Sequence, residues 1–394
     1  MKRFRVKKLL YYIHLVLGLA FCVTITIVGV TGALYSYADD IRDYERAKYL
    51  SARKTTDAKA LSVEEISARF LAQKPSASIR FFSVRNLKGD LNQVGVSAFE
   101  NGGFSYYEVN QYTGEIITNG LISDKFFTAV MIFHRFLSFD GVSAVGKQIV
   151  AATTIAIMVL AIGGFLLYLP TLKRRLFKSL RIEFEAKGYK FLYQLHAVVG
   201  VFTLVFVAVM CLTGLWWSYE WYRNLLVSLA GSDNAIRARM ERREMASGDP
   251  KEMQETFDIA KEIVSGYRSY FIRVPFKDMP YELSYANARY GAYNMLKIDV
   301  QNAKIVSKES YQDKTIGQKL IQNIYALHSG QFFGEIGKAL WALSSLAMAL
   351  FSVSGVMMYY KKIKNRRKNR NVSPRRAKRG VLFQAVGNLG VGRR

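Results

Sequence analysis

Apolar and polar positions alternate along the chain in long blocks. Four blocks, at residues 9–37, 149–169, 191–219 and 336–360, are almost free of charged side chains. An apolar helix of roughly 20 residues crosses the ~30 Å hydrocarbon layer of a membrane, and each block meets this length. The pattern predicts an α-helical membrane protein with four transmembrane helices and two sizeable insertions.

Shorter periodicities predict a small α/β module in each insertion. In the first, residues 61–71 carry apolar side chains at helical spacing, and Ser62 precedes Glu65 in the capping-box pattern of a helix start. Two β-prone runs follow at 78–84 and 104–109.

The second insertion repeats this order, with a helix expected near 255–264 and strands near 270–274 and 293–300. Each insertion closes with a related phrase, Val-Asn-Gln-Tyr-Thr-Gly-Glu-Ile at 109–116 and Ile-Asp-Val-Gln-Asn-Ala-Lys-Ile at 298–305. An Asn or Asp followed by a small turn residue and an apolar strand favours a tight hairpin.

The spans are also repeated. Segment 14–37 lies 182 positions before segment 196–219 and aligns with it without a gap; each begins with histidine, has glycine four residues later, and contains Thr-Gly near its end. A looser match relates 133–168 to 327–359. The chain is therefore predicted to consist of two parallel copies of one unit, each with two spans.

The formal net charge of +26 is concentrated at residues 2–8, 173–190 and from 361 onward. Four crossings put these segments on one side, which the positive-inside rule makes cytoplasmic. Both termini are then cytoplasmic and both insertions face outward, which in a bacterial inner membrane is the periplasmic side. Cations that flank apolar spans are usually topology signals, so we expect a lipid membrane and no nucleic acid as partner.

These boundaries divide the chain into eight predicted segments. They are a cytoplasmic start with the first span (1–38), a first periplasmic domain (39–135), the second span (146–170), a basic cytoplasmic loop (171–190), the third span (191–219), a second periplasmic domain (220–330), the fourth span (336–361) and a basic tail (362–394). The first apolar run is about twice as long as the core of a signal peptide, so we expect an uncleaved helix. The tail is predicted to be disordered.

The chain has four histidines, and each stands at one end of a span: His14, His134, His196 and His328. One interfacial histidine can be a hydrogen-bonded structural residue, but four at span ends with matching surroundings favour a shared function. His14 and His196 lie near cytoplasmic basic clusters, and the other two lie on the periplasmic side. Because the ends of a span are about 30 Å apart, we expect His14 to pair with His196 and His134 with His328.

The strand phrase Thr-Gly-Glu-Ile, the helix-strand order and the placement of the insertions between histidine-bearing spans resemble the PepSY-associated transmembrane family. Within it, the chain resembles inner-membrane ferric-siderophore reductases that carry two haems, up to about residue 362. It departs from the commoner first span, in which an aromatic-rich phrase follows the histidine. It has no flavodoxin-like or ferredoxin-reductase-like extension, so a separate cytoplasmic or quinol electron donor is expected.

The resemblance implies two haem b groups per chain, and two imidazoles facing each other from equivalent helices suit the axial positions of one iron. The expected axial ligands are the two pairs His14/His196 and His134/His328. Gly18 and Gly200, four residues after their histidines, can either leave room for a flat macrocycle or allow close helix packing. Zinc fits less well, because two histidines supply half of a tetrahedral site.

Other residues have two open interpretations. Arg135 can bind a haem propionate bidentately or be an ordinary interfacial cation, and Asp140 and Glu335 are the acidic residues nearest to the periplasmic pair. Cys22 and Cys211 lie inside spans as small apolar side chains. Aromatic residues at the periplasmic span ends can form a membrane-interface belt or dock a ferric chelate. These aromatics are Tyr35, Tyr37, Trp216, Trp217, Tyr219, Trp221 and Tyr222.

The sequence therefore predicts a haem-dependent transmembrane oxidoreductase that reduces a periplasmic ferric siderophore or other ferric chelate and releases its iron. The substrate class comes from the resemblance and the electron path from the histidines. No catalytic acid, base or nucleophile is assigned. The alternative is a non-catalytic, membrane-anchored PepSY protein that binds or regulates a partner. A transporter fits less well, because its usual repeats are inverted.

Overall fold

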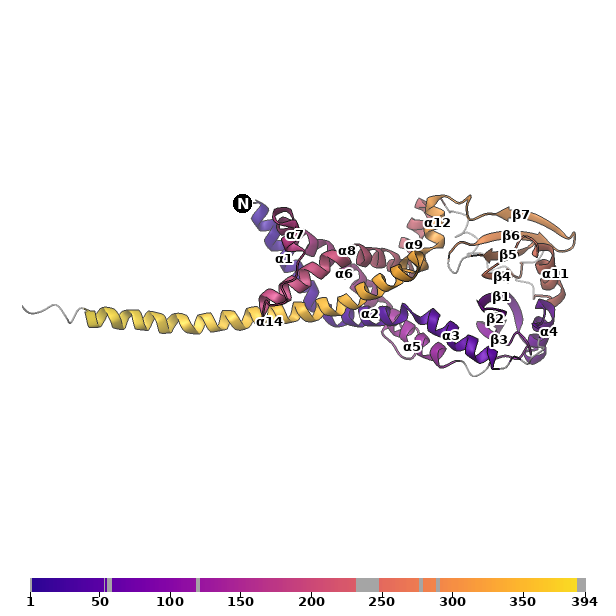
Figure 1. The fold of residues 1–394 in the computed structure, drawn as a ribbon, viewed down its shortest axis with the longest axis horizontal. Helices are drawn as coiled ribbons and strands as arrows, with labels where there is room; N and C mark the ends of the chain where they lie inside the picture. Colours follow the sequence, from indigo (N-terminus) through magenta and orange to yellow (C-terminus); the bar gives the residue numbers. More distant parts are fainter. Residues whose placement is uncertain are drawn as a thin grey trace, which may run out of the picture. The chain divides into compact units, whose positions relative to one another are not determined.

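A computed structural model describes residues 2–52, 54, 59–117, 121–231, 248–275, 279–287 and 291–387 (Figure 1). The chain divides into two compact units. The first unit comprises Met1–Val30, Ala152–Ala208 and Ser344–Arg394. The second comprises Thr31–Ala151 and Val209–Leu343.

Among the described residues, four helical stretches are long and apolar enough to span a membrane. They are Cys22–Ser51, Ala144–Arg174, Tyr189–Ser218 and Gln331–Arg367. The predicted four-span architecture is thus confirmed, and the chain is a multi-pass membrane protein. The long helices are α1 (Lys2–Ala20), α2 (Cys22–Tyr35), α6 (Ala144–Arg174), α8 (Tyr189–Ser218) and α14 (Gly334–Gly387).

The first apolar block differs from the single helix that we expected. It consists of α1 and α2, separated at Phe21. Two hydroxyls beyond the break bond back to the preceding turn: Thr24 donates to the Phe21 carbonyl and Thr26 to that of Cys22. Such bonds compete with the helical ladder and bend helices, which accounts for the interruption.

The basic tail was predicted to be disordered, and this was wrong for its backbone as far as Gly387. Helix α14 continues without a break from the fourth span through the tail. The cost of helix formation lies mainly in nucleation. A span that is already helical supplies the nucleus, and the many Lys and Arg residues that follow are good helix formers.

In the first unit, α2 and α14 approach each other closely. The Ser345 hydroxyl donates to the Gly29 carbonyl at 2.9 Å, and a Cβ built on Gly29 would lie 2.6 Å from the Ser345 carbonyl oxygen. Small residues allow helix backbones to approach in this way. A hydroxyl pair, Thr153 with Thr24, joins α6 to α2 at 2.9 Å.

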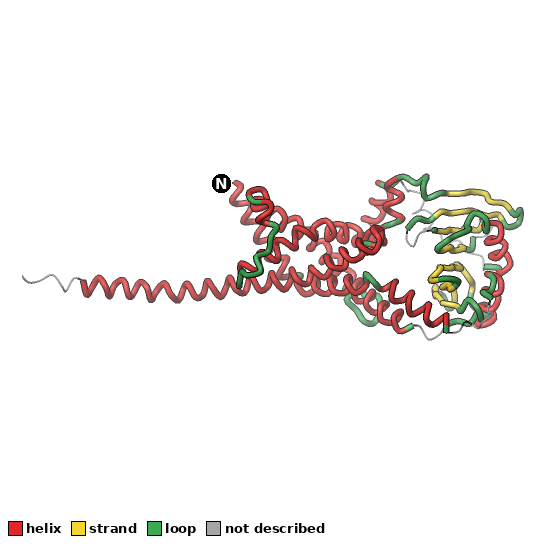
Figure 2. The backbone as a smooth tube through the Cα atoms, viewed as in Figure 1, coloured by secondary structure: helices red, strands yellow, loops and turns green. Residues whose placement is uncertain are grey.

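The second unit contains an antiparallel sheet of seven strands among the described residues, in the order β3-β2-β1-β4-β5-β6-β7. The strands are β1 (Ser78–Lys88), β2 (Leu91–Glu100), β3 (Gly103–Val109), β4 (Ser269–Arg273), β5 (Tyr281–Ala286), β6 (Asn294–Asp299) and β7 (Lys304–Glu309). Figure 2 shows them gathered in one region of the chain.

The sheet corrects our expectation of two separate insertion domains. Strand β1 of the first insertion pairs with β4 of the second, with Ser83 opposite Phe271. Each insertion alone would expose the edge of β1 or β4, and an exposed edge strand readily pairs with another chain. Joining these two edges removes both, so the insertions form one domain.

Two helices cover this sheet, α4 (Val63–Gln73) and α11 (Pro250–Ala260). Phe70 from α4 and Met253 from α11 are fully buried in one core with alternate residues of the strands, such as Phe82 and Val84 of β1. The period of two follows from strand geometry. The predicted capping box is confirmed, since Ser62 and Glu65 bond to each other's backbone amides.

The hairpin phrases also form turns as predicted. After β3, Asn110 accepts from the Tyr112 amide and Gly114 has φ +71°; after β6, Asp299 accepts from the Asn302 amide and Ala303 has φ +47°. The remaining described helices complete the second unit or join the spans. They are α3 (Ala38–Ser51), α5 (Ile122–Phe136), α7 (Leu176–Ser179), α9 (Glu220–Leu229), α12 (Ile316–Gln322), α13 (Ile324–Ser329) and a 3₁₀ turn (Gln331–Phe333).

Candidate functional site

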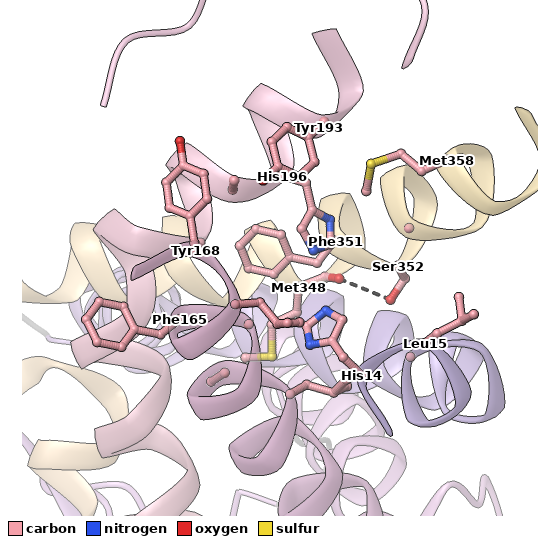
Figure 3. A pocket seen from close by; sticks show the side chains of 18 of the residues that line it. His14, Leu15, Phe165, Tyr168, Tyr193, His196, Met348, Phe351, Ser352 and Met358 are labelled. Atoms are coloured by element: carbon pink, nitrogen blue, oxygen red, sulfur yellow. Dashed lines mark hydrogen bonds between the residues drawn. The ribbon is translucent and has the colours of Figure 1, made fainter. Parts of the chain in front are cut away.

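The first unit brings His14 of α1 and His196 of α8 together. Their ring centres are 6.2 Å apart and their planes are inclined by 73°. Both line a cavity of about 280 Å³, and Figure 3 shows the two imidazoles projecting into it from different helices. Most of the other lining side chains are apolar, as in a typical cofactor pocket.

Helical spacing explains why these histidines face the same cavity. Tyr11, His14 and Gly18 recur at three- and four-residue intervals on α1, and His196 and Gly200 do so on α8. Residues at such intervals share one helix face. The sequence therefore sets the orientation of the pair locally, once the helices are packed.

Gly18 and Gly200 line the cavity and do not mark tight helix contacts. A Cβ at Gly18 would lie 3.9 Å from Leu160 Cδ2, and one at Gly200 would lie 4.0 Å from Phe351 Cε1. These are ordinary contacts, unlike the 2.6 Å clash at Gly29. Of the two interpretations offered by the sequence, room in the cavity is the better supported.

Two further glycines face the histidines directly, and sequence reasoning gave them no role. A Cβ at Gly164 of α6 would lie 3.0 Å from His14 Cε1, and one at Gly355 of α14 would lie 3.9 Å from His196 Cε1. They occupy matching positions in the looser repeat, which was the signal available in the sequence. Glycine at these positions leaves space beside each imidazole.

The polar contacts of the two histidines differ. Nδ1 of His196 lies 2.8 Å from Oγ of Ser354, whereas Nδ1 of His14 is buried without a hydrogen-bond partner among the described residues. The Leu160 carbonyl lies near His14, but no hydrogen bond of good geometry reaches Nδ1. Phe351 packs edge-to-face on His196 at 5.3 Å.

One cation lines this cavity. Among the described lining residues, Lys362 of α14 is the only Lys, Arg, Asp or Glu. Its Nζ donates to Tyr11 Oη at 2.6 Å and lies 4.4 Å from the centre of that ring. A single cation in an apolar pocket favours an anionic group on any ligand bound there.

The second unit brings His134 of α5 near His328 of α13. Each imidazole contacts a threonine hydroxyl through Nδ1, Thr31 for His134 and Thr213 for His328, both at 2.9 Å. Desolvation by the surrounding side chains, together with a smaller repulsion from His134, lowers the pKa of His328 to about 4. Both threonines belong to the Thr-Gly pairs that lie 182 positions apart in the sequence.

The defining sequence pattern of the PepSY-associated TM region family matches residues 11–362. The chain belongs to this family. No curated protein matches its sequence. Assignment to the PepSY-associated family agrees with the four apolar spans and with a strand-rich insertion, and it covers all four histidines.

In this PepSY-associated protein, Arg135, Asp140 and Glu335 lie in three different environments. The Arg135 guanidinium lies over the Phe136 ring at 5.1 Å, and Glu335 pairs with Lys338 at 2.8 Å. Asp140 is exposed. Within the described residues, no three His, Cys, Asp or Glu side chains are grouped as for a metal ion, so each histidine pair offers two protein ligands.

The predicted aromatic group divides into residues with different contacts. Trp217 packs edge-to-face on His328 at 5.3 Å, while Trp221 is 64% exposed. Tyr35 accepts a hydrogen bond from Arg42 and packs on Phe127. Trp217 therefore belongs to the surroundings of the histidine pair, and Trp221 has the exposure expected of an interface residue.

Sequence reasoning missed a buried charge cluster in the second unit. Arg46 of α3 is 3% exposed and pairs with Glu108 of β3 and Asp124 of α5. Burial opposes its charge, but the hydrogen bond and charge of Glu108 and the charge of Asp124 raise the pKa of Arg46. Burial raises the pKa of Glu108, and Arg46 offsets this only in part. The available signal was the spacing of Asp39, Arg42, Asp43 and Arg46 on one helix face.

Proposed function

We propose that this protein carries electrons across the inner membrane through two haem groups and reduces a ferric chelate, of which ferric siderophores are the expected class, in the periplasm. The observation that carries the proposal is the convergence of His14 and His196 in an apolar, glycine-lined cavity. A second imidazole pair with matching polar contacts supports a second haem site.

The spacing of the first pair fits two axial ligands of one iron. Metal–imidazole bonds of about 2.0 Å, with roughly 1.1 Å from ring nitrogen to ring centre, put two such centres ~6.3 Å apart. The ring centres of His14 and His196 are 6.2 Å apart. Their mutual inclination of 73° is compatible with this, because each ring can rotate about its bond to the metal.

The lining residues suit a flat ring with acidic substituents. Gly18, Gly200, Gly164 and Gly355 leave the space beside the histidines free of side chains. Lys362 and Tyr11 supply a cation and a hydroxyl for a propionate. When bound, haem b would supply the one-electron Fe(III)/Fe(II) couple that two histidines cannot supply themselves.

Direction follows from charge. The basic clusters support a cytoplasmic location for the His14–His196 end, and in this proposal electrons enter there from a quinol or a cytoplasmic reductant and leave at the His134–His328 end. One quinol, oxidised to quinone with release of two protons, provides electrons for two ferric chelates. Each chelated Fe(III) becomes Fe(II), which oxygen-rich chelators bind less tightly, and the iron is released.

The test is the absorption spectrum and haem content of the purified protein. We expect a Soret band, a six-coordinate b-type spectrum and about two haems per chain. His14→Ala and His196→Ala should each lose the same haem, and His134→Ala and His328→Ala the other. A colourless protein would overturn the proposal, and loss of one shared haem in His14→Ala and His134→Ala would overturn the pairing.

A non-catalytic binding protein is the second candidate, and one observation favours it. Phe99 and Phe104 lie against each other at 5.3 Å at the β2–β3 edge of the sheet, and Phe104 is 65% exposed. An edge strand with exposed aromatics is suited to pairing with a partner. This function predicts a colourless protein whose partner binding is lost in Phe104→Ser.

A further inference from the structure

Hydroxyl groups fix which nitrogen of two histidines carries the proton. The Ser354 hydroxyl donates to the Leu350 carbonyl at 2.7 Å, and the Thr213 hydroxyl donates to the Val209 carbonyl at 2.6 Å. A hydroxyl has one proton, and a carbonyl can only accept. With that proton directed to the carbonyl, each hydroxyl can only accept from its imidazole, so the contacts of Ser354 with His196 and of Thr213 with His328 are assigned as Nδ1–H donations.

This tautomer leaves Nε2 of both histidines with its lone pair. A metal ligand needs such a nitrogen, and the partner of the opposite nitrogen determines which one is available. His134 has the same Nδ1 contact with Thr31, the residue that corresponds to Thr213 in the aligned segments. Three of the four histidines thus have an Nδ1 contact with a hydroxyl.

His14 differs, and the sequence shows the reason. Gly164 faces His14 as Gly355 faces His196, and the residue before each glycine is Gly163 in one case and Ser354 in the other. Gly163 therefore occupies the position of the serine but has no hydroxyl. The Leu160 carbonyl lies near His14, but no hydrogen bond of good geometry joins it to Nδ1.

We infer that Thr31, Thr213 and Ser354 are positioning residues that set the tautomer and strengthen their histidines as ligands, and that Gly163 makes His14 the weaker ligand of its pair. This rests on the proposed function. A hydrogen bond from Nδ1–H raises the basicity of the imidazole, and a more basic axial ligand stabilises Fe(III) relative to Fe(II). His14 and His196 would therefore be unequal ligands to a haem iron bound between them.

The experiment measures midpoint potentials of the two haems by spectroelectrochemical titration of the purified full-length protein. Gly163→Ser adds a hydroxyl at the position that corresponds to Ser354, in open space where a Cβ meets nothing within 4 Å. It should lower the potential of the His14–His196 haem, with at least a threefold change in the ferric-to-ferrous preference, about 30 mV for one electron. Ser354→Ala should raise that potential, and Ser354→Thr should restore it.

Two matched variants separate the hydroxyl from its surroundings. Gly163→Ala adds the Cβ alone, and Ser345→Ala removes a hydroxyl on the same helix that donates to the Gly29 carbonyl and does not line the cavity. Neither should move either potential. In all variants, the potential of the His134–His328 haem should stay unchanged.

Haem content separates failure of this inference from failure of the proposed function. A wild-type protein without haem overturns the proposed function. If wild type holds two haems and neither Gly163→Ser nor Ser354→Ala changes the potential, the inference is overturned. It is also overturned if Gly163→Ala shifts the potential as much as Gly163→Ser. If one variant does not fold, the other still decides the question.

Discussion

His14 and His196 project from long helices into an apolar cavity, whereas His134 and His328 lie on helices α5 and α13, which are not among the candidate spans. Glycines beside the first pair leave space around the rings. Threonine hydroxyls hold both members of the second pair. The first site thus depends on space beside its rings and on one hydroxyl contact, that of Ser354 with His196, whereas the second has a hydroxyl contact at both members, so different substitutions should disrupt each.

A substitution that fills the His14–His196 cavity should reduce haem content more than any other change proposed below. In Gly164→Leu, the added side chain would start 3.0 Å from His14 Cε1 and displace the imidazole. We expect haem content to fall from about two to about one, as measured by a pyridine haemochrome assay. Gly163→Ala, which adds a Cβ in open space, is the control. Retention of two haems in Gly164→Leu would show that this cavity is not a haem site.

Arg46→Met should selectively weaken haem retention at the His134–His328 site. It leaves the carboxylates of Glu108 and Asp124 without their buried partner, and breaking a buried ion pair costs about 3 kcal/mol or more. Asp124 and His134 share helix α5, so the His134–His328 haem should be lost at a lower denaturant concentration than in wild type. Simultaneous loss of both haems would contradict this. Arg223→Met, which removes an exposed ion pair with Glu220, is the control.

Thr213→Val keeps the shape of the side chain and removes the hydroxyl that contacts His328. Loss of such a contact typically lowers metal affinity 10- to 100-fold. Haem titration of the haem-free protein should show this decrease at the His134–His328 site alone. The control is Thr203→Val on the same helix, whose hydroxyl donates to the Val199 carbonyl. Equal loss in both variants would assign the effect to the helix and not to the histidine.

Lys362→Gln should weaken haem binding at the His14–His196 site modestly. The substitution removes the cation that lines its cavity, and a partly solvated ion pair is worth about 1 kcal/mol, roughly fivefold in affinity. We expect a haem titration to show weaker binding at the His14–His196 site at low salt, with the difference decreasing at high salt. Lys361→Gln on the same helix should bind haem as wild type does.

The smallest expected effect is a pH-dependent change in stability at the start of helix α5. Glu45 accepts from the Ile122 and Ser123 amides. Desolvation opposes its charge, but these hydrogen bonds lower its pKa below 4.5. The stabilisation is therefore present above the unfolded-state pKa and lost as pH falls through the folded one. Glu45→Gln should therefore destabilise the protein more at pH 7 than in acid below the folded-state pKa. Equal costs at both pH values in denaturant melts would contradict this.

Local patterns predicted much of this molecule. The four spans follow from hydropathy, and the Ser62–Glu65 capping box and the turn at Gly114 follow from short motifs. The pairing of β1 with β4 does not follow from any local pattern, because it joins residues such as Phe82 and Ile272 that are far apart in the sequence. Strand pairing at that distance has no periodic signature.

The site shows the same limit. The sequence shows the histidines, the repeated glycines and Ser354. It does not show that Ser354 contacts His196, because that contact depends on how α8 and α14 pack. The Arg46 cluster draws its acidic partners from a strand and a second helix. Partners on other elements cannot be read from spacing within one element.

The β1–β4 pairing also constrains how the chain is made. Phe82 pairs with Ile272, which is synthesised about 190 residues later. At roughly 5–20 residues per second, β1 waits some 10–40 s for its partner. During that interval a sheet edge is open while two more spans must be inserted. Such high contact order slows folding, so the nascent first half is the stage at which a chaperone would matter most.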